Sequence, residues 1–317
     1  KRKKKAALLT AYIYSTLKMK SASYNIVAFG FDNHFKEAIT NQLPDVRFVD
    51  ENIHNAPPSS LHDVDVALVF VFSKVRDDVL REMPNVEAII SLSAGLDHVD
   101  KDACEKRDIG VYNTPGYGSQ TVAEQVFALL LTFERHIHVL QEENQLDFSR
   151  EPYLSRQLGG KAFGVIGTGK IGRAAAKIAK GFDMDVLGYD VHHNEEFESI
   201  GRYASLSQIA QQSDYVSLHI PLLPSTENMW SEKYIRKMKS DALLVNVSRA
   251  GVLDEGAALE SLENGTLRGL LLDVYSKNHY KQLTNRNDVL LTPHNAFYTN
   301  HAISNMVKTT KKIIEDL

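Results

Sequence analysis

The chain has 317 residues, of which 43% are hydrophobic and 24% are charged, and its formal net charge at pH 7 is −4. This length suits two domains of roughly 150 residues each, and the composition excludes a largely disordered chain. The charge balance gives no overall attraction to nucleic acid or to an anionic membrane, so neither is expected as a partner. No apolar run approaches the roughly 18 residues that cross a bilayer.

The single cysteine, Cys104, cannot form an internal disulfide. Such cysteine usage is typical of a reducing compartment, so we expect a cytoplasmic protein in which Cys104 is a small buried residue. Residues 1–22 begin with "KRKKK" and a short apolar stretch, which loosely resembles a signal peptide. Lysines follow that stretch closely, and no small-residue cleavage site precedes the first strand. We therefore interpret residues 1–22 as an N-terminal extension rather than an export signal.

The first part of the chain alternates strand-like and helix-like segments. Apolar and β-branched runs predict strands at 24–30, 64–72, 86–93 and 110–113. Amphipathic runs between them predict helices at 34–43, 75–83 and 102–109. Strands separated by helices indicate a parallel sheet, so the residues up to about 115 are expected to form one α/β unit.

A long helix and a second α/β series follow. The segment 120–143 is apolar nearly all round, which predicts one helix buried between domains or subunits. Apolar runs then predict strands at 162–167, 185–190, 215–220, 242–248, 269–274 and 288–293. Their continuous apolar character suits a sheet that is covered on both faces. The expected fold class is α/β, with two doubly wound, Rossmann-like domains of parallel sheet.

A glycine-rich turn opens the second series, with the pattern Gly167-x-Gly169-x-x-Gly172. It follows a strand and begins a helix, and Asp190 ends the next strand, as a dinucleotide-binding loop requires. Gly167 would make the tight turn, Gly169 would let the backbone approach a pyrophosphate, and Gly172 would let helix and strand pack closely. Asp190 can bond both ribose hydroxyls of NAD and would repel the 2′-phosphate of NADP, so we expect NAD. The residues between the glycines, Thr168, Lys170 and Ile171, belong to the same expected site.

Several further motifs are separate from the glycine loop: "SAGLDHVD" (93–100), "NTPGY" (113–117), "HIPL" (219–222), "NVSRAGVLDE" (246–255), "LDVY" (272–275) and "TPHNAFYT" (292–299). Together with the loop, they resemble the D-isomer-specific 2-hydroxyacid dehydrogenase family from about residue 24 to the end. The last motif looks most like the D-lactate dehydrogenase branch. The resemblance implies reversible, NAD-dependent hydride transfer between NADH and a small 2-keto acid, which gives a D-2-hydroxy acid.

The resemblance also implies a domain organisation. The substrate domain is expected to consist of residues 23–115 and 294–317, with the NAD-binding domain, residues 116–293, inserted between them. This arrangement explains why the glycine loop lies in the middle of the chain. The helix at 120–143 resembles the dimer-forming segment of the family, so a homodimer is expected.

Reduction of a 2-keto acid needs a cation for the carboxylate and a proton donor for the developing alkoxide. Arg249 follows a predicted strand, and its planar guanidinium can grip a carboxylate in a fixed orientation. By resemblance to the "SR" motif of the family, it anchors substrate. His294 follows another strand and resembles the general acid/base of the family, because an imidazole can donate or accept a proton near neutral pH.

Substrate and cofactor contacts follow from the same resemblance. "SAGLD" is similar to the loop whose backbone N–H groups receive the substrate carboxylate, which indicates Ala94 and Gly95. Tyr117 and Tyr298 would close over a small side chain, or are packing residues. The other residues that the resemblance places at the cofactor are His219, Pro221, Val247, Ser248 and Asp273. No metal is implied, and His98, His192 and His193 are expected to be surface or loop residues.

One position departs from the family pattern. The family usually has a glutamate five residues after the aspartate of "LDV", paired with the catalytic histidine, and this chain has Asn278 there. A carboxylate would raise the pKa of the histidine, whereas an amide can only orient the ring. Formate dehydrogenase is similar in pairing an amide with this histidine, so the chemistry can persist. A loop rearrangement that brings in another group is an alternative.

Other functions are compatible with the same motifs. An NAD(H)-sensing binding protein of the corepressor type is one alternative, favoured by Asn278 and opposed by the intact Arg249 and His294. Glyoxylate/hydroxypyruvate reductase and phosphoglycerate dehydrogenase are alternatives within the enzyme class. The sequence does not distinguish between 2-keto acids, because one methylene in an apolar pocket changes selectivity by only about 1–3 kcal/mol.

Overall fold

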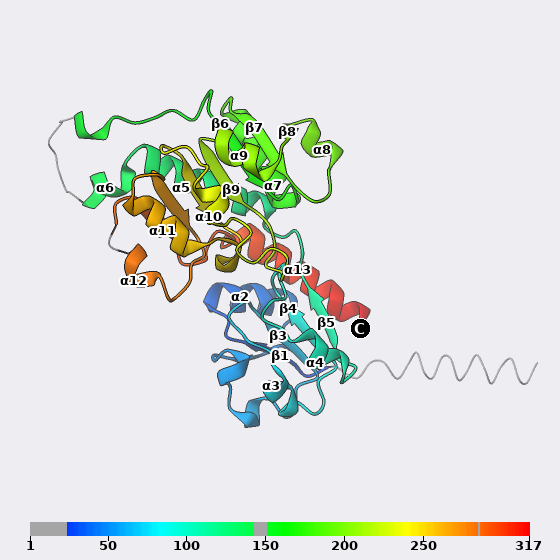
Figure 1. The fold of residues 1–317 in the computed structure, drawn as a ribbon. Coiled ribbons are helices and arrows are strands. Elements are labelled where there is room, and N and C mark those ends of the chain that lie inside the picture. Colours follow the sequence, from blue (N-terminus) through cyan, green and yellow to red (C-terminus); the bar gives the residue numbers. More distant parts are fainter. Residues whose placement is uncertain (1–23, 143–150, 285) are drawn as a thin grey trace, which may run out of the picture. The chain divides into compact units, whose positions relative to one another are not determined.

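The computed structural model describes residues 24–142, 151–284 and 286–317, which form two compact units (Figure 1). Unit 1 contains the residues up to Pro115 together with Met306–Leu317, and unit 2 contains Gly116–Asn305. The chain returns to unit 1 within its last helix, later than the boundary at 294 expected from the sequence, so His294 belongs to unit 2. The extension expected at 1–22 lies outside the described residues.

Unit 1 is built on a parallel five-stranded sheet with the strand order β2-β1-β3-β4-β5. Its elements are β1 (Ile26–Phe29), α2 (Asn33–Gln42), β2 (Arg47–Val49), the short 3-10 turns η1 (Ile53–Asn55) and η2 (Pro58–Ser60), β3 (Val66–Val69), α3 (Asp77–Arg81), β4 (Ala88–Ser91), α4 (Lys101–Glu105) and β5 (Gly110–Asn113). Every residue of β3 and β4 is buried, which agrees with a sheet covered on both faces. Cys104 lies in this core and is fully buried, as expected.

Unit 2 is built on a parallel seven-stranded sheet with the order β12-β11-β10-β9-β6-β7-β8. Its elements are α5 (Ser119–Glu134), α6 (Ile137–Glu142), η3 (Glu151–Tyr153), β6 (Ala162–Ile166), α7 (Lys170–Gly181), β7 (Asp185–Tyr189), α8 (Glu195–Glu198), β8 (Arg202–Tyr203), α9 (Leu206–Gln212), β9 (Tyr215–Leu218), α10 (Glu232–Ile235), β10 (Leu243–Asn246), η4 (Ala250–Val252), α11 (Glu255–Glu263), β11 (Gly269–Leu272), α12 (Tyr280–Leu283) and β12 (Val289–Leu291). The last helix, α13 (Asn300–Asp316), begins in unit 2 and ends in unit 1. The two parallel sheets confirm the expected fold class.

The single helix expected at 120–143 is wrong. The structure has α5 and α6 instead, separated at Arg135 and His136, and His136 has a left-handed φ of 54°. The last residue of α5, Glu134, is buried, accepts the O–H of Tyr215 at 2.8 Å and forms an ion pair with Arg268. Because these contacts tie the end of α5 to the sheet, the chain turns there, although no glycine or proline marks the turn.

Local signals account for several helix starts. Asp32 caps α2 by accepting the N–H groups of His34 and Phe35, and Asp100 caps α4 through Ala103. The two strands that the sequence did not predict, β2 and β8, are three and two residues long. Such short edge strands carry too few residues for a periodic pattern. Within the described ranges, no helix combines the length and the apolar character that a bilayer span needs.

Candidate active site

The glycine loop lies at the carboxyl end of β6 and the start of α7. Gly167 has a φ of +96°, and a Cβ there would lie 2.7 Å from the main-chain oxygen of His219. A Cβ on Gly172 would lie 1.9 Å from the main-chain oxygen of Gly167, so a larger residue would push helix and strand apart. A Cβ on Gly169 would meet no described atom within 4 Å. The backbone at Gly169 is therefore open to a ligand, which a pyrophosphate at this helix N-terminus requires.

Asp190 follows β7, the neighbour of β6 in the sheet. Its Oδ2 accepts the N–H of Thr168 at 2.7 Å, and its Oδ1 accepts the N–H of His192 at 3.2 Å. The hydroxyl of Thr168 lies 3.3 Å from the same Oδ2 and 2.8 Å from the hydroxyl of Tyr203. These contacts hold the carboxylate against the glycine loop, where an acid that binds the ribose of a dinucleotide is required.

The strand order of unit 2 reverses at β6. The sheet grows from β6 to β8 in one direction and from β9 to β12 in the other. Doubly wound sheets bind their ligands outside the carboxyl ends of the strands at such a reversal. His219 and Pro221 follow β9, and Val247 and Ser248 follow β10, so these expected cofactor residues share that edge with the glycine loop.

His219 is half-buried at this edge, and both of its ring nitrogens are buried. Neither ring nitrogen has a hydrogen-bond partner among the described residues, and burial lowers the pKa of His219 to about 3. The imidazole is therefore neutral near pH 7. A neutral ring suits a residue that lines a binding site better than one that must carry the proton for the reaction.

Arg249 follows β10 and is positioned by a residue that the sequence analysis did not single out. Asn246, the last residue of β10, is fully buried. Its Nδ2 donates to the main-chain oxygen of Arg249 at 2.8 Å, while its Oδ1 accepts the N–H and the hydroxyl of Ser248 at 3.1 and 2.9 Å. This one amide folds the turn from which the guanidinium projects. The motif "NVSR" contained the signal, since asparagine favours such side-chain-to-backbone turns.

His294 follows Pro293, beyond β12, and has a left-handed φ of 56°. Its N–H donates to the main-chain oxygen of Asp273 at 2.8 Å. The buried carboxylate of Asp273 accepts the hydroxyl of Thr292 at 2.6 Å and the N–H groups of Asn295 and Ala296 at 3.0 Å each. Asp273 was expected at the cofactor, and the structure shows in addition that it holds the segment that carries His294.

Phe297 connects His294 with the two tyrosines that are expected at the substrate. The ring of Phe297 lies edge-on to those of His294 at 6.2 Å, Tyr117 at 6.4 Å and Tyr298 at 5.8 Å between centroids. Burial raises the pKa of Tyr117 to about 12, and the positive charge of Arg249 opposes that rise. The structure therefore brings Tyr117, Tyr298 and His294 around one buried phenylalanine, with the charge of Arg249 acting on Tyr117. The sequence analysis did not name Phe297.

Asn278 lies on an exposed turn between β11 and α12. Its N–H donates to the hydroxyl of Ser276 at 3.2 Å. The turn is held by Glu255, a buried carboxylate that accepts the N–H of Ser276 at 2.8 Å and contacts Nδ1 of His279 at 2.9 Å. Glu255 therefore fixes the backbone beside Asn278. The role of Asn278 towards His294 stays a prediction.

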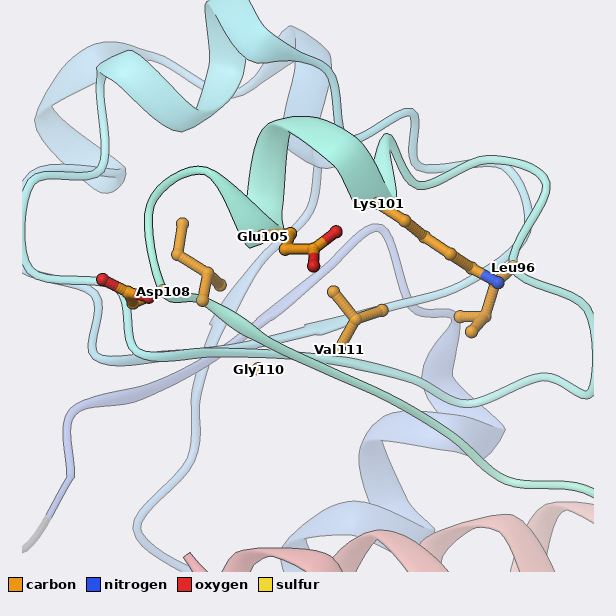
Figure 2. Close-up of a pocket in the computed structure, with 7 residues that line it drawn as sticks. Leu96, Lys101, Glu105, Asp108, Gly110 and Val111 are labelled. Atoms are coloured by element: carbon orange, nitrogen blue, oxygen red, sulfur yellow. The ribbon is translucent and has the colours of Figure 1, made fainter.

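Ala94 and Gly95 belong to unit 1, in the loop between β4 and α4. Ala94 is exposed, and its main-chain oxygen accepts Nδ2 of Asn113 at 2.6 Å. A hollow of about 470 Å³ lies beside this loop, between α4 and β5, and Figure 2 shows its lining. The lining residues are Leu96, Lys101, Glu105, Asp108, Ile109, Gly110 and Val111. None of the expected site residues lines it, so this hollow is not the candidate active site.

Across residues 24–142, 151–284 and 286–317, no three or more histidine, cysteine, aspartate or glutamate side chains come together as ligands of an ion. The candidate site in unit 2 is thus described by a glycine loop, an acid, an arginine, a histidine and an aromatic group.

Comparisons with known proteins identify the family of this chain. The sequence model of the D-isomer specific 2-hydroxyacid dehydrogenase NAD-binding domain matches residues 127–296. A D-lactate dehydrogenase of Curvularia clavata is 31% identical over 86% of this chain and 84% of its own length. A glyoxylate reductase of Thermococcus litoralis is 31% identical over 87% of this chain and 92% of its own. The structure of a D-lactate dehydrogenase from Aquifex aeolicus, in complex with NAD and lactic acid, matches with a TM-score of 0.84 at 30% identity, and the match covers 92% of this chain and 94% of that one.

Proposed function

Because this chain belongs to the D-isomer specific 2-hydroxyacid dehydrogenase family and is an NAD-dependent enzyme, we propose that it reduces a small 2-keto acid reversibly to the D-2-hydroxy acid. Pyruvate and its near homologues are the proposed substrates, supported by the relatives named D-lactate dehydrogenase. The observation that carries the proposal is the grouping in unit 2. There, Tyr117 and His294 pack against Phe297, and Arg249 follows β10 on the turn that Asn246 holds.

The proposed roles follow from the chemistry of each side chain. NADH, bound at the glycine loop and Asp190, would supply the hydride to the keto carbon. Arg249 would hold the substrate carboxylate with two parallel N–H groups, which fixes the orientation of the keto group. As the carbonyl oxygen gains the electron pair of its π bond, His294 would donate a proton to it and become neutral. In the oxidation direction, the neutral imidazole would take that proton back.

A second candidate activity is the reduction of glyoxylate or hydroxypyruvate. The 31% identity to a glyoxylate reductase, over nearly the same share of the chain, favours it. Both activities use the same carboxylate anchor and proton donor, and they differ only in the group beside the keto carbon. The substrate panel below therefore distinguishes them.

We also propose a cytoplasmic homodimer. Three large apolar side chains are exposed around α6 and η3: Ile137 (46%), Leu140 (42%) and Leu154 (88%). Ile137 and Leu140 lie three positions apart on α6 and share a face of that helix, and exposed apolar residues that lie together mark interaction surfaces. This region includes the segment that resembles the dimer-forming part of the family. The cytoplasmic location is supported by the free, buried Cys104.

The experiment that tests the proposed function is NADH oxidation by the purified protein with a panel of 2-keto acids. The panel should contain pyruvate, 2-ketobutyrate, phenylpyruvate, glyoxylate and hydroxypyruvate. We expect turnover with at least one of them, and His294→Ala should reduce kcat by roughly 10²–10⁴-fold while NADH still binds. NADH binding with no turnover on any keto acid would contradict the proposal.

A further inference from the structure

The loop after β4 has three successive carbonyl groups that are each held by a donor. The main-chain oxygen of Ser93 accepts the N–H of Thr114 at 2.9 Å, and that of Ala94 accepts Nδ2 of Asn113 at 2.6 Å. The main-chain oxygen of Gly95 accepts the hydroxyl of Ser93 at 2.7 Å. All of these residues belong to unit 1. Three consecutive peptide groups are thus fixed in orientation by their oxygens.

Fixed carbonyls imply fixed N–H groups. The described chain contains no cis peptide, and in a trans peptide the N–H points opposite to the C=O of the same group. The N–H groups of Ala94, Gly95 and Leu96 are therefore directed away from the donors that hold the loop. Among the described residues, none accepts a hydrogen bond from these three N–H groups. They are three successive main-chain donors with a fixed orientation, and main-chain N–H groups of this kind can bind an anion.

The hydroxyl of Ser93 begins a buried relay. Oγ of Ser93 lies 2.7 Å from Oγ of Ser91, which in turn lies 2.9 Å from Nε2 of His98. Ser91 and Ser93 are at most 1% exposed and His98 is 5% exposed. His98 was expected to be a surface or loop residue. It lies in a loop, but it is buried rather than at the surface.

The direction of the hydrogen bonds in this relay follows from the number of protons that each side chain can donate. A serine hydroxyl has one O–H to donate. Ser93 donates it to the oxygen of Gly95, so it must accept from Ser91. Ser91 has then used its own proton and must accept from His98, so the proton of His98 is on Nε2. Each donor in such a chain polarises the next one. The polarisation strengthens the hydrogen bond to the oxygen of Gly95 and makes the N–H of Leu96, in the same peptide group, a better donor.

We propose that His98, Ser91 and Asn113 are positioning residues that aim the N–H groups of Ala94, Gly95 and Leu96 at the substrate carboxylate. The inference rests on the proposed function, because the anion it invokes is the carboxylate of the 2-keto acid. His98 and Ser91 act through Ser93 on the third peptide of the loop. Asn113, from the edge strand β5, acts independently on the second peptide.

The relay can be cut at each link with small changes. Ser91→Ala and His98→Phe remove one donor each, and Asn113→Ala removes the independent donor. His98→Gln keeps a donor close to the position of Nε2 and serves as the conservative variant. Ser73→Ala is the matched control, because Ser73 is also fully buried in unit 1 and contacts Asn52 and Ile53 rather than the loop.

Each variant should be tested for folding by its melting temperature and then for kcat, for KM of the keto acid and for the Kd of NADH. Each of Ser91→Ala, His98→Phe and Asn113→Ala removes the support of one loop peptide, so its N–H is no longer held in the binding orientation. The KM of the keto acid should then rise roughly five- to tenfold. NADH binding and kcat should change much less, and His98→Gln should return KM towards the parent value. The inhibition constant of oxamate, an unreactive 2-keto acid mimic, should follow KM.

Three results would overturn the inference. One is an unchanged KM in folded Ser91→Ala, His98→Phe and Asn113→Ala. Another is a rise in the Kd of NADH as large as the rise in the KM of the keto acid, because such a change indicates a general structural effect. The third is a KM in Ser73→Ala that rises as much as in the relay variants. In all three cases the parent enzyme still reduces a keto acid. If the parent showed no turnover at all, that result would contradict the proposed function itself.

Discussion

The N–H of His294 donates to the main-chain oxygen of Asp273 at 2.8 Å, and the carboxylate of the same aspartate accepts the next two N–H groups at 3.0 Å each. One buried residue thus holds three successive N–H groups around a left-handed histidine. A non-glycine residue in this conformation is strained and persists only where its surroundings over-determine it. The backbone from which the imidazole projects is therefore set by Asp273.

Replacing the carboxylate of Asp273 by an amide tests this contact. In Asp273→Asn, the N–H₂ group takes the place of Oδ2, where it faces the N–H of Ala296, or of Oδ1, where it faces the N–H of Asn295 and the hydroxyl of Thr292. In either orientation at least one main-chain N–H loses its acceptor. We expect a loss of about 1–3 kcal/mol in the free energy of unfolding and a lower kcat. Urea denaturation and steady-state kinetics measure the two effects. Asp254→Asn is the control, because Asp254 caps α11 through the N–H of Ala257, and asparagine is an equally good cap. Equal effects in the two variants would contradict the prediction.

Arg249→Lys tests the proposed carboxylate anchor. Lysine keeps the positive charge but cannot present two parallel N–H groups. KM for the keto acid should rise roughly 10–100-fold, while the Kd of NADH should stay close to that of the parent. Arg156→Lys changes a half-exposed ion pair with Asp241 and should leave KM unaltered. A parent-like KM in Arg249→Lys would exclude a bidentate grip on the substrate.

Asn278→Glu tests the departure from the family pattern. If this position faces His294 in the working enzyme, a carboxylate there would raise the pKa of the imidazole by stabilising its charged form. Reduction requires the protonated imidazole, so the pH range of reduction should extend upwards in the variant. The parent should correspondingly work at lower pH than relatives that have the glutamate.

The measurement is the pH dependence of kcat/KM for reduction. Gln282→Glu adds the same charge on the exposed side of α12 and serves as the control. A profile of Asn278→Glu that overlays that of the parent would refute the hypothesis.

The buried ring nitrogens of His219 predict a sensitivity to acid. Burial lowers the pKa of His219 to about 3 in the folded state, from an ordinary value of 6.5. Below pH 6.5 the unfolded chain takes up a proton that the folded chain resists, so the free energy of unfolding falls as the pH decreases towards 3. The contribution is up to about 1.4 kcal/mol per pH unit, or about 2 kcal/mol between pH 6.5 and 5.

Chemical denaturation at pH 7 and pH 5 checks this sign and size. The loss of stability between the two pH values should be smaller in His219→Gln than in the parent, whatever the absolute stability of the variant. His192→Gln, at an exposed position, should behave as the parent does. The same pH dependence in all three proteins would show that His219 is accessible to protons in the folded state.

The proposed homodimer predicts a change in molecular mass. Leu154→Asp and Leu140→Asp place a charge at exposed apolar positions around α6 and η3. If these positions lie in the dimer contact, size-exclusion chromatography with light scattering should show a shift from dimer to monomer. Phe72→Asp alters a residue that is 54% exposed in unit 1 and should leave the mass unchanged. A parent that elutes as a monomer would contradict the proposal directly.

The sequence by itself determined the order of the buried strands and the place of the glycine loop. Buried strands such as "VALV" and "GLLL" are recognisable because each of their residues meets an apolar surface, whatever its partners are. The glycine loop and Asp190 were recognisable for a similar reason. The tight turn at Gly167 and the close approach at Gly172 constrain the local backbone, so that only one residue type fits.

Only the tertiary structure decided how the side chains of the site are held. Asp273 meets Ala296 across 23 positions of the chain, Ser91 meets His98 across seven, and Glu134 meets Arg268 across 134. A hydrogen bond depends on distances of a few tenths of an ångström, and many polar residues in the sequence could have formed each of these pairs. Residue type and spacing therefore identify which groups are able to form such hydrogen bonds and ion pairs. Their selection as partners depends on how the strands bring distant segments to one edge of the sheet.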